Sequence, residues 1–515
     1  WPAQHSDARR LVPYKHYWKG DLEMSLESFR AKPYRSKRLQ SYFSRMSKDN
    51  LNPLFDDVVA SVLDSQGFNV TESPRSIYKV DKLYDALEKY APSASPFIKV
   101  TPAVRAGVRL AYKCFAKPQD VPYLEPMPLT ADTVMQLTSN NQASAGLTAY
   151  GETKAQSQVR ALNRAKQILS GEKAPEPCLA FKRTQFNDKT RLVWGYPYSM
   201  TILEGIFARP LINQFKGGST PMAFAMSNLQ MGTRLRVSSY QRRYCYSLDM
   251  SSFDSSIAAY LINEAFGILS TWFNWDELIT EPWDVVVNYF ITAPIVMPNG
   301  KIYHGRRHGV PSGSYFTQII DSIVNVILAG AVSYEFDLGI NRRSIMVLGD
   351  DLIFWSNKRV SLNAIAKFAR SSLCINVHGS EKSAIFKRGD IIHYLGRDWD
   401  NGIPTLDVEK VLQRALYPET FRRYSKDRWK REKEARLMLW AMAQTYKSFY
   451  PVLQKILLPS DWYACHDTER SDISLFENSL FLPEVSHLSG NLRYRYMFDE
   501  SLRERKVYSA AHILH

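Results

Sequence analysis

The chain has 515 residues, of which 45% are apolar and 23% are charged. This ordinary globular composition excludes a mostly disordered chain, a collagen and a disulfide-stapled miniprotein, and the length allows roughly three or four domains. Lysine and arginine number 66 against 51 acidic residues, for a formal net charge of +15. Such an excess favours a polyanionic partner, because clustered cations release counterions from a phosphate backbone. A merely soluble basic protein would carry the same charge.

Cysteine usage and hydropathy exclude two further kinds of site. The 5 cysteines are scattered and include no CxxC pair, which indicates a reducing compartment and argues against a structural zinc site. No membrane partner is expected, because the longest apolar stretch, 316–334, carries polar side chains that lipid would not accept cheaply: Thr317, Gln318, Asp321 and Asn325. No signal peptide is predicted, and because Trp1 is not Met, residues could be missing before it.

The first part of the chain is predicted to form short elements joined by loops. Residues 1–50 are rich in Lys and Arg interleaved with Tyr and Trp. They form either an arm laid over the protein with solvated charges or a contact with nucleic acid. Helical patterns fill 80–90 and 154–169. Proline-containing loops are expected at 92–96, 118–128 and 175–177.

The middle of the chain alternates short apolar strands with helices. Strands are predicted at 244–248, 345–348, 352–355 and 391–395, and helices at 257–271, 314–332 and 364–373. The two strands around Gly349-Asp350-Asp351 form a hairpin signal. This order predicts an α+β fold in which helices back an antiparallel sheet. After residue 408 the pattern is mostly helical.

Three acids lie at the ends of predicted strands. Asp249 follows one strand, and Asp350 and Asp351 occupy the hairpin turn. Carboxylates at such a tip are suitable ligands for hard divalent cations such as Mg²⁺. Two such ions roughly 4 Å apart can activate a 3′-oxygen and stabilise a leaving pyrophosphate. The tripeptide Gly-Asp-Asp alone occurs by chance in roughly one chain of this length in ten, so its surroundings decide.

The surrounding motifs form an ordered set. Asp249-x4-Asp254 comes first, then Ser312-Gly313-x3-Thr317, and then Gly349-Asp350-Asp351. This order resembles the palm of viral RNA-dependent RNA polymerases over about residues 140–400. The stretch 309–325 looks specifically like polymerases of partitiviruses, which have double-stranded RNA genomes, and picobirnavirus enzymes are the next match. The resemblance implies a right-hand polymerase fold with fingers, palm and thumb.

The resemblance assigns roles to the ordered motifs. Asp249, Asp350 and Asp351 match the metal-binding acids for two Mg²⁺ ions, with Mn²⁺ as an alternative and the Met250 carbonyl as a further ligand. Asp254 matches the residue that senses the ribose 2′-hydroxyl, a group that a carboxylate can accept from. The same sugar-reading network is matched by Ser312, Gly313, Thr317 and Asp321.

One of these positions departs from the family pattern. Many relatives have Asn where this chain has Asp321. Asp321 would form the same network as an acceptor only, or Asn325 would have a different part. Packing and capping of a helix would also account for Thr317, Asp321 and Asn325.

Further matches implicate basic and small residues in binding. Lys189 and Arg191 resemble the fingers motif over the triphosphate, with Lys182 and Arg183 nearby as RNA-binding candidates. Arg191 is preferred because its planar fork takes two phosphate oxygens. Ser144 and Gly146 resemble the loop that steers the template strand, where missing side chains let RNA approach. A solvated basic hairpin and a chance tripeptide are the alternatives.

Two later segments complete the resemblance. Lys382 matches the lysine that protonates the leaving pyrophosphate, although an exposed surface lysine fits its pattern nearly as well. Residues 392–397 resemble the strand and turn that grip the primer end. Residues 414–436 are rich in Lys and Arg with interleaved aromatic residues. Arg428 and Arg431 there would track RNA phosphates, or would only solvate a helix face.

The domain organisation follows from the resemblance. An N-terminal extension bridges fingers and thumb and closes the hand. The boundaries are 1–95 for the extension, 96–243 for fingers, 244–260 for palm, 261–308 for a fingers insertion, 309–402 for palm, and 403–515 for thumb and C-terminal segment.

The sequence therefore predicts an RNA-directed RNA polymerase. Its expected partners are template and product RNA, NTPs and a viral capsid protein, and its expected location is the virion interior and the host cytoplasm. A reverse transcriptase would share the palm acids but would usually block the 2′-hydroxyl with a bulky aromatic residue. A non-catalytic, RNA-binding capsid component would explain the charge but not the spaced acids.

Overall fold

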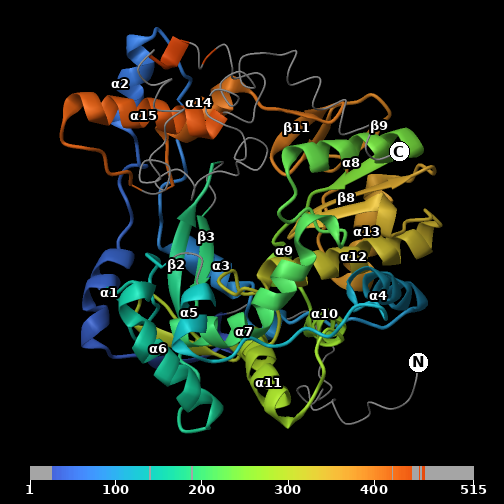
Figure 1. Cartoon of the computed structure of the whole chain (residues 1–515), viewed down its shortest axis with the longest axis horizontal. Helices are drawn as coiled ribbons and strands as arrows, with labels where there is room; N and C mark the ends of the chain where they lie inside the picture. Colours follow the sequence, from blue (N-terminus) through green and yellow to red (C-terminus); the bar gives the residue numbers. More distant parts are fainter. Residues whose placement is uncertain are drawn as a thin grey trace.

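The fold is seen in a computed structural model that describes residues 26–72, 74–137, 141–186, 190–419 and 421–443, together with 452 and 455–458. Lys189 and the first half of the basic, aromatic N-terminal stretch lie outside the described residues. Within them, helices and largely antiparallel sheets are combined (Figure 1), so the predicted α+β class is confirmed.

A four-stranded antiparallel sheet contains the acidic strand ends. Its order is β7 (Ile345–Leu348), β8 (Asp351–Ser356), β4 (Tyr244–Leu248) and β9 (Ala384–Lys387). Aliphatic and aromatic residues make β7 and β8 almost wholly buried, as suits a sheet that is covered by other elements. The first three strands match the sequence prediction, whereas β9 was not predicted.

Two further sheets extend the fold. One has the order β1 (Arg30–Pro33), β6 (Lys301–His304), β5 (Ile295–Val296), β2 (Cys178–Thr184) and β3 (Thr190–Gly195), with β2 and β5 parallel. The other consists of β10 (Ile392–Tyr394), β11 (Arg397–Asp400) and β12 (Ile403–Thr405). Of these strands only β10 was predicted.

Helices surround the sheets. They are α1 (Gln40–Met46), α2 (Asp57–Ser65), α3 (Asp81–Glu88), α4 (Pro102–Phe115), α5 (Ala131–Leu137), α6 (Lys154–Leu169), α7 (Tyr198–Phe215), α8 (Asn228–Gln241), α9 (Phe253–Ser256), α10 (Ala259–Ser270), α11 (Glu277–Thr292), α12 (Thr317–Phe336), α13 (Leu362–Leu373), α14 (Val408–Leu416) and α15 (Arg428–Ala443).

Helix α12 is the central helix of the core. It packs against α4 at a close crossing, where a Cβ on Gly107 would lie 2.2 Å from the Ile327 carbonyl oxygen and one on Gly330 would lie 2.8 Å from Gly107 Cα. Only glycine permits this approach of two backbones. Helix α12 is long and apolar enough to cross a membrane by composition, but 78% of that stretch is buried inside the protein, as in a core helix.

The N-terminal segment contacts two distant parts of the chain. Strand β1 joins β6, and α3 packs on β3, whereas α2 packs with α14 and α15 (Figure 1). The buried Asp56 carboxylate at the start of α2 accepts hydrogen bonds from Arg422 at 2.8 Å and Tyr424 at 2.7 Å. A buried charge needs such partners, so these contacts fix α2 against the C-terminal helices.

Candidate active site

Strand register brings the three acids together. Strands β4 and β8 are antiparallel, with Leu248 opposite Leu352. The next position in this register sets Asp249 opposite Asp351, and directly opposed residues have Cβ atoms about 4.5–5.5 Å apart. Asp350 lies in the adjoining hairpin turn. Three carboxylates from neighbouring strands are thus presented at one edge of the sheet.

The hairpin differs from the predicted one in a single respect. Asp351 is the first residue of β8, so the turn consists of Gly349 and Asp350 rather than all three residues. Gly349 has a φ of +63°, which glycine adopts without strain. Helix α12 holds this turn from behind, since Ser322 Oγ accepts from Gly349 N at 2.9 Å and Asn325 Nδ2 donates to Gly349 O at 2.6 Å. Asn325 therefore supports the acidic turn.

Mutual repulsion of the acids shows in their pKa values. Removal from solvent and the nearby Asp350 and Asp249 charges raise the pKa of Asp351 to about 6, against the opposing effect of His393 and Arg191. Burial and Asp350 likewise raise the pKa of Asp254 to about 6, and Arg191 lowers it. Arg191, an exposed residue of β3, is therefore the cation that faces this group of acids.

The donor set suits a hard divalent cation. The side chains of Asp249, Asp350 and Asp351 are all exposed, and their oxygens are the ligands that Mg²⁺ prefers. Among the described residues, no group of three or more His, Cys, Asp and Glu side chains already lies at metal-binding spacing. The three carboxylates are thus close enough to repel one another without forming a closed ligand set. Met250 pairs with Val377 in an isolated bridge beside them.

Asp321 lies behind this group and differs from its expected form. Its side chain is 3% exposed, and in the described part of the chain its Oδ1 has no hydrogen-bond partner. Burial, followed by the charges of Asp254 and Asp350, raises the pKa of Asp321 well above its usual value. The acid therefore holds its proton near neutrality and can donate, so the expectation of an acceptor only is wrong.

The loop 309–317 is held on several sides. Val310 N donates to Asp254 O at 2.7 Å, which ties the loop to α9. Ser312 Oγ accepts from Trp194 N at 3.2 Å, and Thr317 Oγ1 donates to Pro311 O at 2.6 Å. A Cβ on Gly313 would lie 1.9 Å from the Trp194 carbonyl oxygen. Ser312 and Gly313 thus lie directly against the strand that carries Arg191.

Lys382 lies in a turn that packs against the first acidic strand. His378 N donates to Asp249 O at 2.8 Å, and Asp249 N donates to Ser383 Oγ at 3.1 Å. The exposed Lys382 ammonium lies 3.5 Å from His378 Nε2. His378 Nδ1 is 3.2 Å from Glu381 Oε1. The turn is therefore anchored to the Asp249 backbone, and the lysine is free to extend into solvent.

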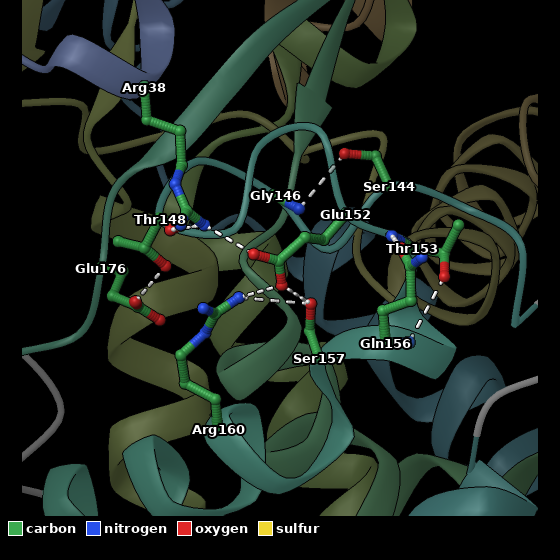
Figure 2. Close-up of polar contacts among 10 residues, drawn as sticks. All are labelled: Arg38, Ser144, Gly146, Thr148, Glu152, Thr153, Gln156, Ser157, Arg160 and Glu176. Carbon is green, nitrogen blue, oxygen red and sulfur yellow. Dashed lines mark hydrogen bonds and ion pairs between the residues drawn. The ribbon is translucent and has the colours of Figure 1, made fainter.

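The loop with Ser144 and Gly146 is folded tightly on itself (Figure 2). Gly146 N donates to Ser144 Oγ at 3.3 Å. Gly146 is buried at a φ of +91°, and a Cβ there would lie 2.8 Å from Pro197 Cα. Glycine is thus required by internal packing and not by an approaching RNA backbone, which corrects the physical reason given for it. Ser144 itself is exposed.

Two arginines converge beside this loop. In Figure 2 the Glu152 carboxylate lies between Arg38, at 2.8 Å, and Arg160. Arg38 also donates to Thr148 O at 3.2 Å. Arg38 belongs to the N-terminal segment, which therefore supports the loop from outside.

The remaining basic candidates already have protein partners. The Lys182 ammonium lies 3.8 Å from the centre of the Tyr78 ring and donates to Asn50 at 3.2 Å. Arg183 pairs with Glu419 at 2.6 Å. Arg428, at the start of α15, pairs with Glu432 at 3.0 Å, yet its side chain is 84% exposed. Arg431 on the same helix is half-buried.

Sequence reasoning missed one buried acid near the site. Glu204 of α7 is fully buried and accepts from Ser314 Oγ at 2.7 Å and Tyr315 N at 3.0 Å. The available signal was a lone acid within an apolar helix, since the flanking residues of α7 are buried almost without exception.

The chain is similar to known viral proteins in sequence. A family model described as "Viral RNA-dependent RNA polymerase" matches residues 186–454, slightly more than half of the chain. The RNA-directed RNA polymerase of Cryptosporidium parvum virus 1 is 33% identical over 162 residues, which cover 29% of this chain and 30% of that protein. That of Atkinsonella hypoxylon virus is 31% identical over 134 residues, covering 24% and 20%. That of White clover cryptic virus 1 is 24% identical over 261 residues, covering 44% and 42%.

Solved structures show the same fold. The RNA-dependent RNA polymerase of a human picobirnavirus superposes with a TM-score of 0.65 at 16% identity, over 88% of this chain and 93% of that chain. The Sicinivirus 3Dpol polymerase gives 0.60 at 15% identity, over 79% and 93%. The expected right-hand polymerase fold is confirmed by these likenesses.

The three polymerases matched in sequence come from viruses of the double-stranded RNA group that the motifs 309–325 indicated. The matched segments span less than half the length of each of these relatives. The resemblance seen in the ordered acids and the 309–325 stretch is confirmed by the match over 186–454: the chain belongs to the viral RNA-dependent RNA polymerase family.

Proposed function

We propose that the chain is an RNA-dependent RNA polymerase that transcribes and replicates a viral RNA genome. It transfers nucleotides from NTPs to the 3′-hydroxyl of a nascent RNA. The observation that carries this proposal is the strand register that sets Asp249 opposite Asp351, with Asp350 in the adjoining turn. The palm acids of the family stand at these positions.

The residues of this edge have distinct parts in the proposal. Asp249, Asp350 and Asp351 hold divalent metal ions, which polymerases of this family use, and we propose Mg²⁺, with Mn²⁺ as an alternative and the Met250 carbonyl as a further ligand. When bound, the ions supply charge stabilisation at the transferred phosphate and at the attacking oxygen. The fork of Arg191 holds the triphosphate, with Lys189 beside it. Position and charge carry most of such a phosphoryl transfer.

The other candidates surround the nucleotide and the RNA. Asp254, Ser312, Thr317 and Asp321 read the sugar, and Lys382 supplies a proton to the leaving pyrophosphate. Ser144 and Gly146 shape the path of the template, and Lys182, Arg183, Arg428 and Arg431 contribute positive charge along the RNA. The proton on Asp321 lets it donate a hydrogen bond, as an asparagine amide would.

The domain boundaries complete the proposal. Residues 96–243 and 261–308 form fingers, 244–260 and 309–402 form palm, and 403–515 form thumb and C-terminal segment. Residues 1–95 bridge fingers and thumb, which is supported by the packing of α3 on β3 and of α2 on α15. We propose template and product RNA, NTPs and a viral capsid protein as partners, and the virion interior and host cytoplasm as locations.

RNA synthesis by the purified chain tests the function. A defined RNA template is supplied with labelled NTPs, with and without a primer, and with Mg²⁺, Mn²⁺ or a chelator. We expect template-dependent product that disappears when the metal is removed. Binding of RNA without any product under all these conditions would instead favour a non-catalytic RNA-binding protein.

Replacing Asp254 by Ala should change sugar choice. The lost hydrogen bond belongs to the 2′-hydroxyl, so NTP use should fall about tenfold relative to dNTP use. Single-nucleotide incorporation with each sugar measures the ratio. Ser256→Ala, on the same short helix with its hydroxyl bonded to Phe253 O at 2.9 Å, is the control. An unchanged ratio in Asp254→Ala would remove this residue from the sugar site.

Replacing Arg428 and Arg431 by Ala should weaken RNA binding on all sequences alike. Each lost phosphate contact on duplex RNA lowers the slope of log affinity against log salt by about 0.9, so two contacts give a change of about 1.8. Filter binding at several salt concentrations measures it. The control removes the exposed Arg109 and Lys113 of α4, which lies far from α15 in Figure 1. Equal slopes for the two double variants would mean that the α15 cations only solvate a helix face.

A further inference from the structure

The loop 309–317 is fixed on one side by a buried carboxylate that none of the proposed catalytic steps uses. Glu204 lies on α7, in the part of the chain before the palm, and its side chain is 0% exposed. Its two oxygens take separate donors from the loop: Oε1 accepts from Ser314 Oγ at 2.7 Å, and Oε2 accepts from Tyr315 N at 3.0 Å. Both donors directly follow Ser312 and Gly313.

The opposite side of the loop is fixed by β3. Ser312 Oγ accepts from Trp194 N at 3.2 Å, and Gly313 lies so close to Trp194 that a Cβ would be 1.9 Å from its carbonyl oxygen. The loop is therefore clamped between Trp194 and Glu204. Movement away from Glu204 would carry Ser312 away from the strand that presents Arg191.

A second contact supports the clamp at Tyr315. Its hydroxyl donates to Leu137 O at 2.5 Å, and the Arg209 guanidinium lies 5.1 Å from the centre of its ring. Of the cations around Glu204, Lys154 of α6 contributes a favourable charge and has its own ammonium 5.5 Å from the Tyr198 ring. Glu204 has no ion pair at contact distance within the described residues.

A carboxyl group at this place is costly unless it has a use. An apolar side chain of similar size would fill the same space without the penalty of burying a polar group. Burial raises the pKa of Glu204 to about 8, and the hydrogen bonds from Ser314 and Tyr315 oppose that rise. What the carboxyl group adds over an apolar residue is the pair of hydrogen bonds to the loop.

We propose that Glu204 is a positioning residue that sets the loop carrying Ser312 and Thr317 at the height required to read the ribose of the incoming nucleotide. This inference rests on the proposed polymerase function. Glu204 does not touch the nucleotide. It acts through Ser314 and Tyr315, and its effect should appear in nucleotide binding and sugar choice.

Two substitutions at Glu204 separate its hydrogen bonds from its volume. Glu204→Met keeps the length and loses both hydrogen bonds. Glu204→Gln keeps the shape, and its amide can serve both loop partners, because the oxygen accepts from Tyr315 N and the NH₂ group donates to Ser314 Oγ. We expect Glu204→Met to raise the KM for NTP roughly tenfold and to lower the NTP-to-dNTP preference, and Glu204→Gln to restore both.

The control is a buried polar residue on the same helix. Thr201 is 6% exposed and donates to Pro197 O at 3.3 Å, within its own helix start. Thr201→Val removes a buried hydrogen bond from α7 without touching the loop. Loss of folded protein alone would lower the active fraction, and hence kcat, in both variants, with KM and sugar preference unchanged.

A change on the loop side covers the case in which Glu204→Met does not fold. Ser314→Ala removes one of the two hydrogen bonds and leaves Glu204 in place, so it should raise the KM for NTP by a smaller factor. The proposal is overturned if either folded variant has the wild-type KM and wild-type sugar preference. Wild-type chain that makes no RNA would refute the polymerase function itself, a result distinguishable from either of these.

Discussion

Asp350→Asn should abolish RNA synthesis while leaving the fold intact. Asp350 is exposed in the two-residue turn between β7 and β8, so an isosteric amide there disturbs no packing. It removes a full negative charge from the group formed with Asp249 and Asp351. Loss of a metal-ligand charge commonly costs several kcal/mol of transition-state stabilisation, which corresponds to roughly a thousandfold loss in rate.

Single-turnover incorporation measures this loss, and thermal unfolding checks the fold. Asp337→Asn is the matched control, because it makes the same chemical change at a side chain that is 88% exposed and pairs with Lys358 at the end of α12. The control should be fully active. Near-normal synthesis by Asp350→Asn would show that the acidic turn does not hold the metal.

Gly313→Ala should be the most damaging single methyl group in the loop 309–317. A Cβ there would lie 1.9 Å from the Trp194 carbonyl oxygen, and the obstacle is backbone on both sides, which no rotamer change can relieve. We expect the loop to move by more than about 1 Å, with roughly a hundredfold loss of activity and about 1–3 kcal/mol of destabilisation.

The control for this change is another glycine in a helix. Gly267 of α10 is exposed, and nothing lies within 4 Å of the position its Cβ would take. Gly267→Ala should leave activity unchanged and stabilise the protein by up to about 1 kcal/mol. Steady-state kinetics and denaturant unfolding measure both variants. If Gly313→Ala matched Gly267→Ala in activity, the close approach to Trp194 would have no part in placing the loop.

Local signals in the sequence were sufficient for the central elements. Helix α6 was predicted at its observed bounds, and Thr153 and Gln156 form a capping box at its start. Strands β4 and β7 were also predicted at their bounds, because their apolar runs end at turn residues. The candidate metal acids follow from these strands, since antiparallel pairing fixes which residues face one another.

Long-range pairing was beyond sequence reasoning. Strand β5 has only two residues and pairs in parallel with β2, more than a hundred residues earlier in the chain. No local periodicity indicates such a pair. The same limit applies to Gly146, whose need for glycine comes from Pro197, and to Glu204, whose partners lie on a loop distant in sequence.

Ionisation states depended on burial that the sequence did not reveal. Asp321 was expected to accept only, because an aspartate is usually ionised. Its burial beside Asp254 and Asp350 keeps it protonated, and this makes it a donor in the same way as the asparagine of many relatives. The departure from the family pattern at this position is therefore smaller in hydrogen bonding than in sequence.

The central claim is that the acids at the sheet edge direct nucleotide transfer under instruction from an RNA template. Single-nucleotide incorporation on a primed RNA, with the templating base changed in turn to each of the four, tests it most directly. The account predicts that the NTP added follows the templating base, requires a divalent metal, and is lost in Asp350→Asn but not in Asp337→Asn. Incorporation that ignores the templating base, or that survives in Asp350→Asn, would contradict it.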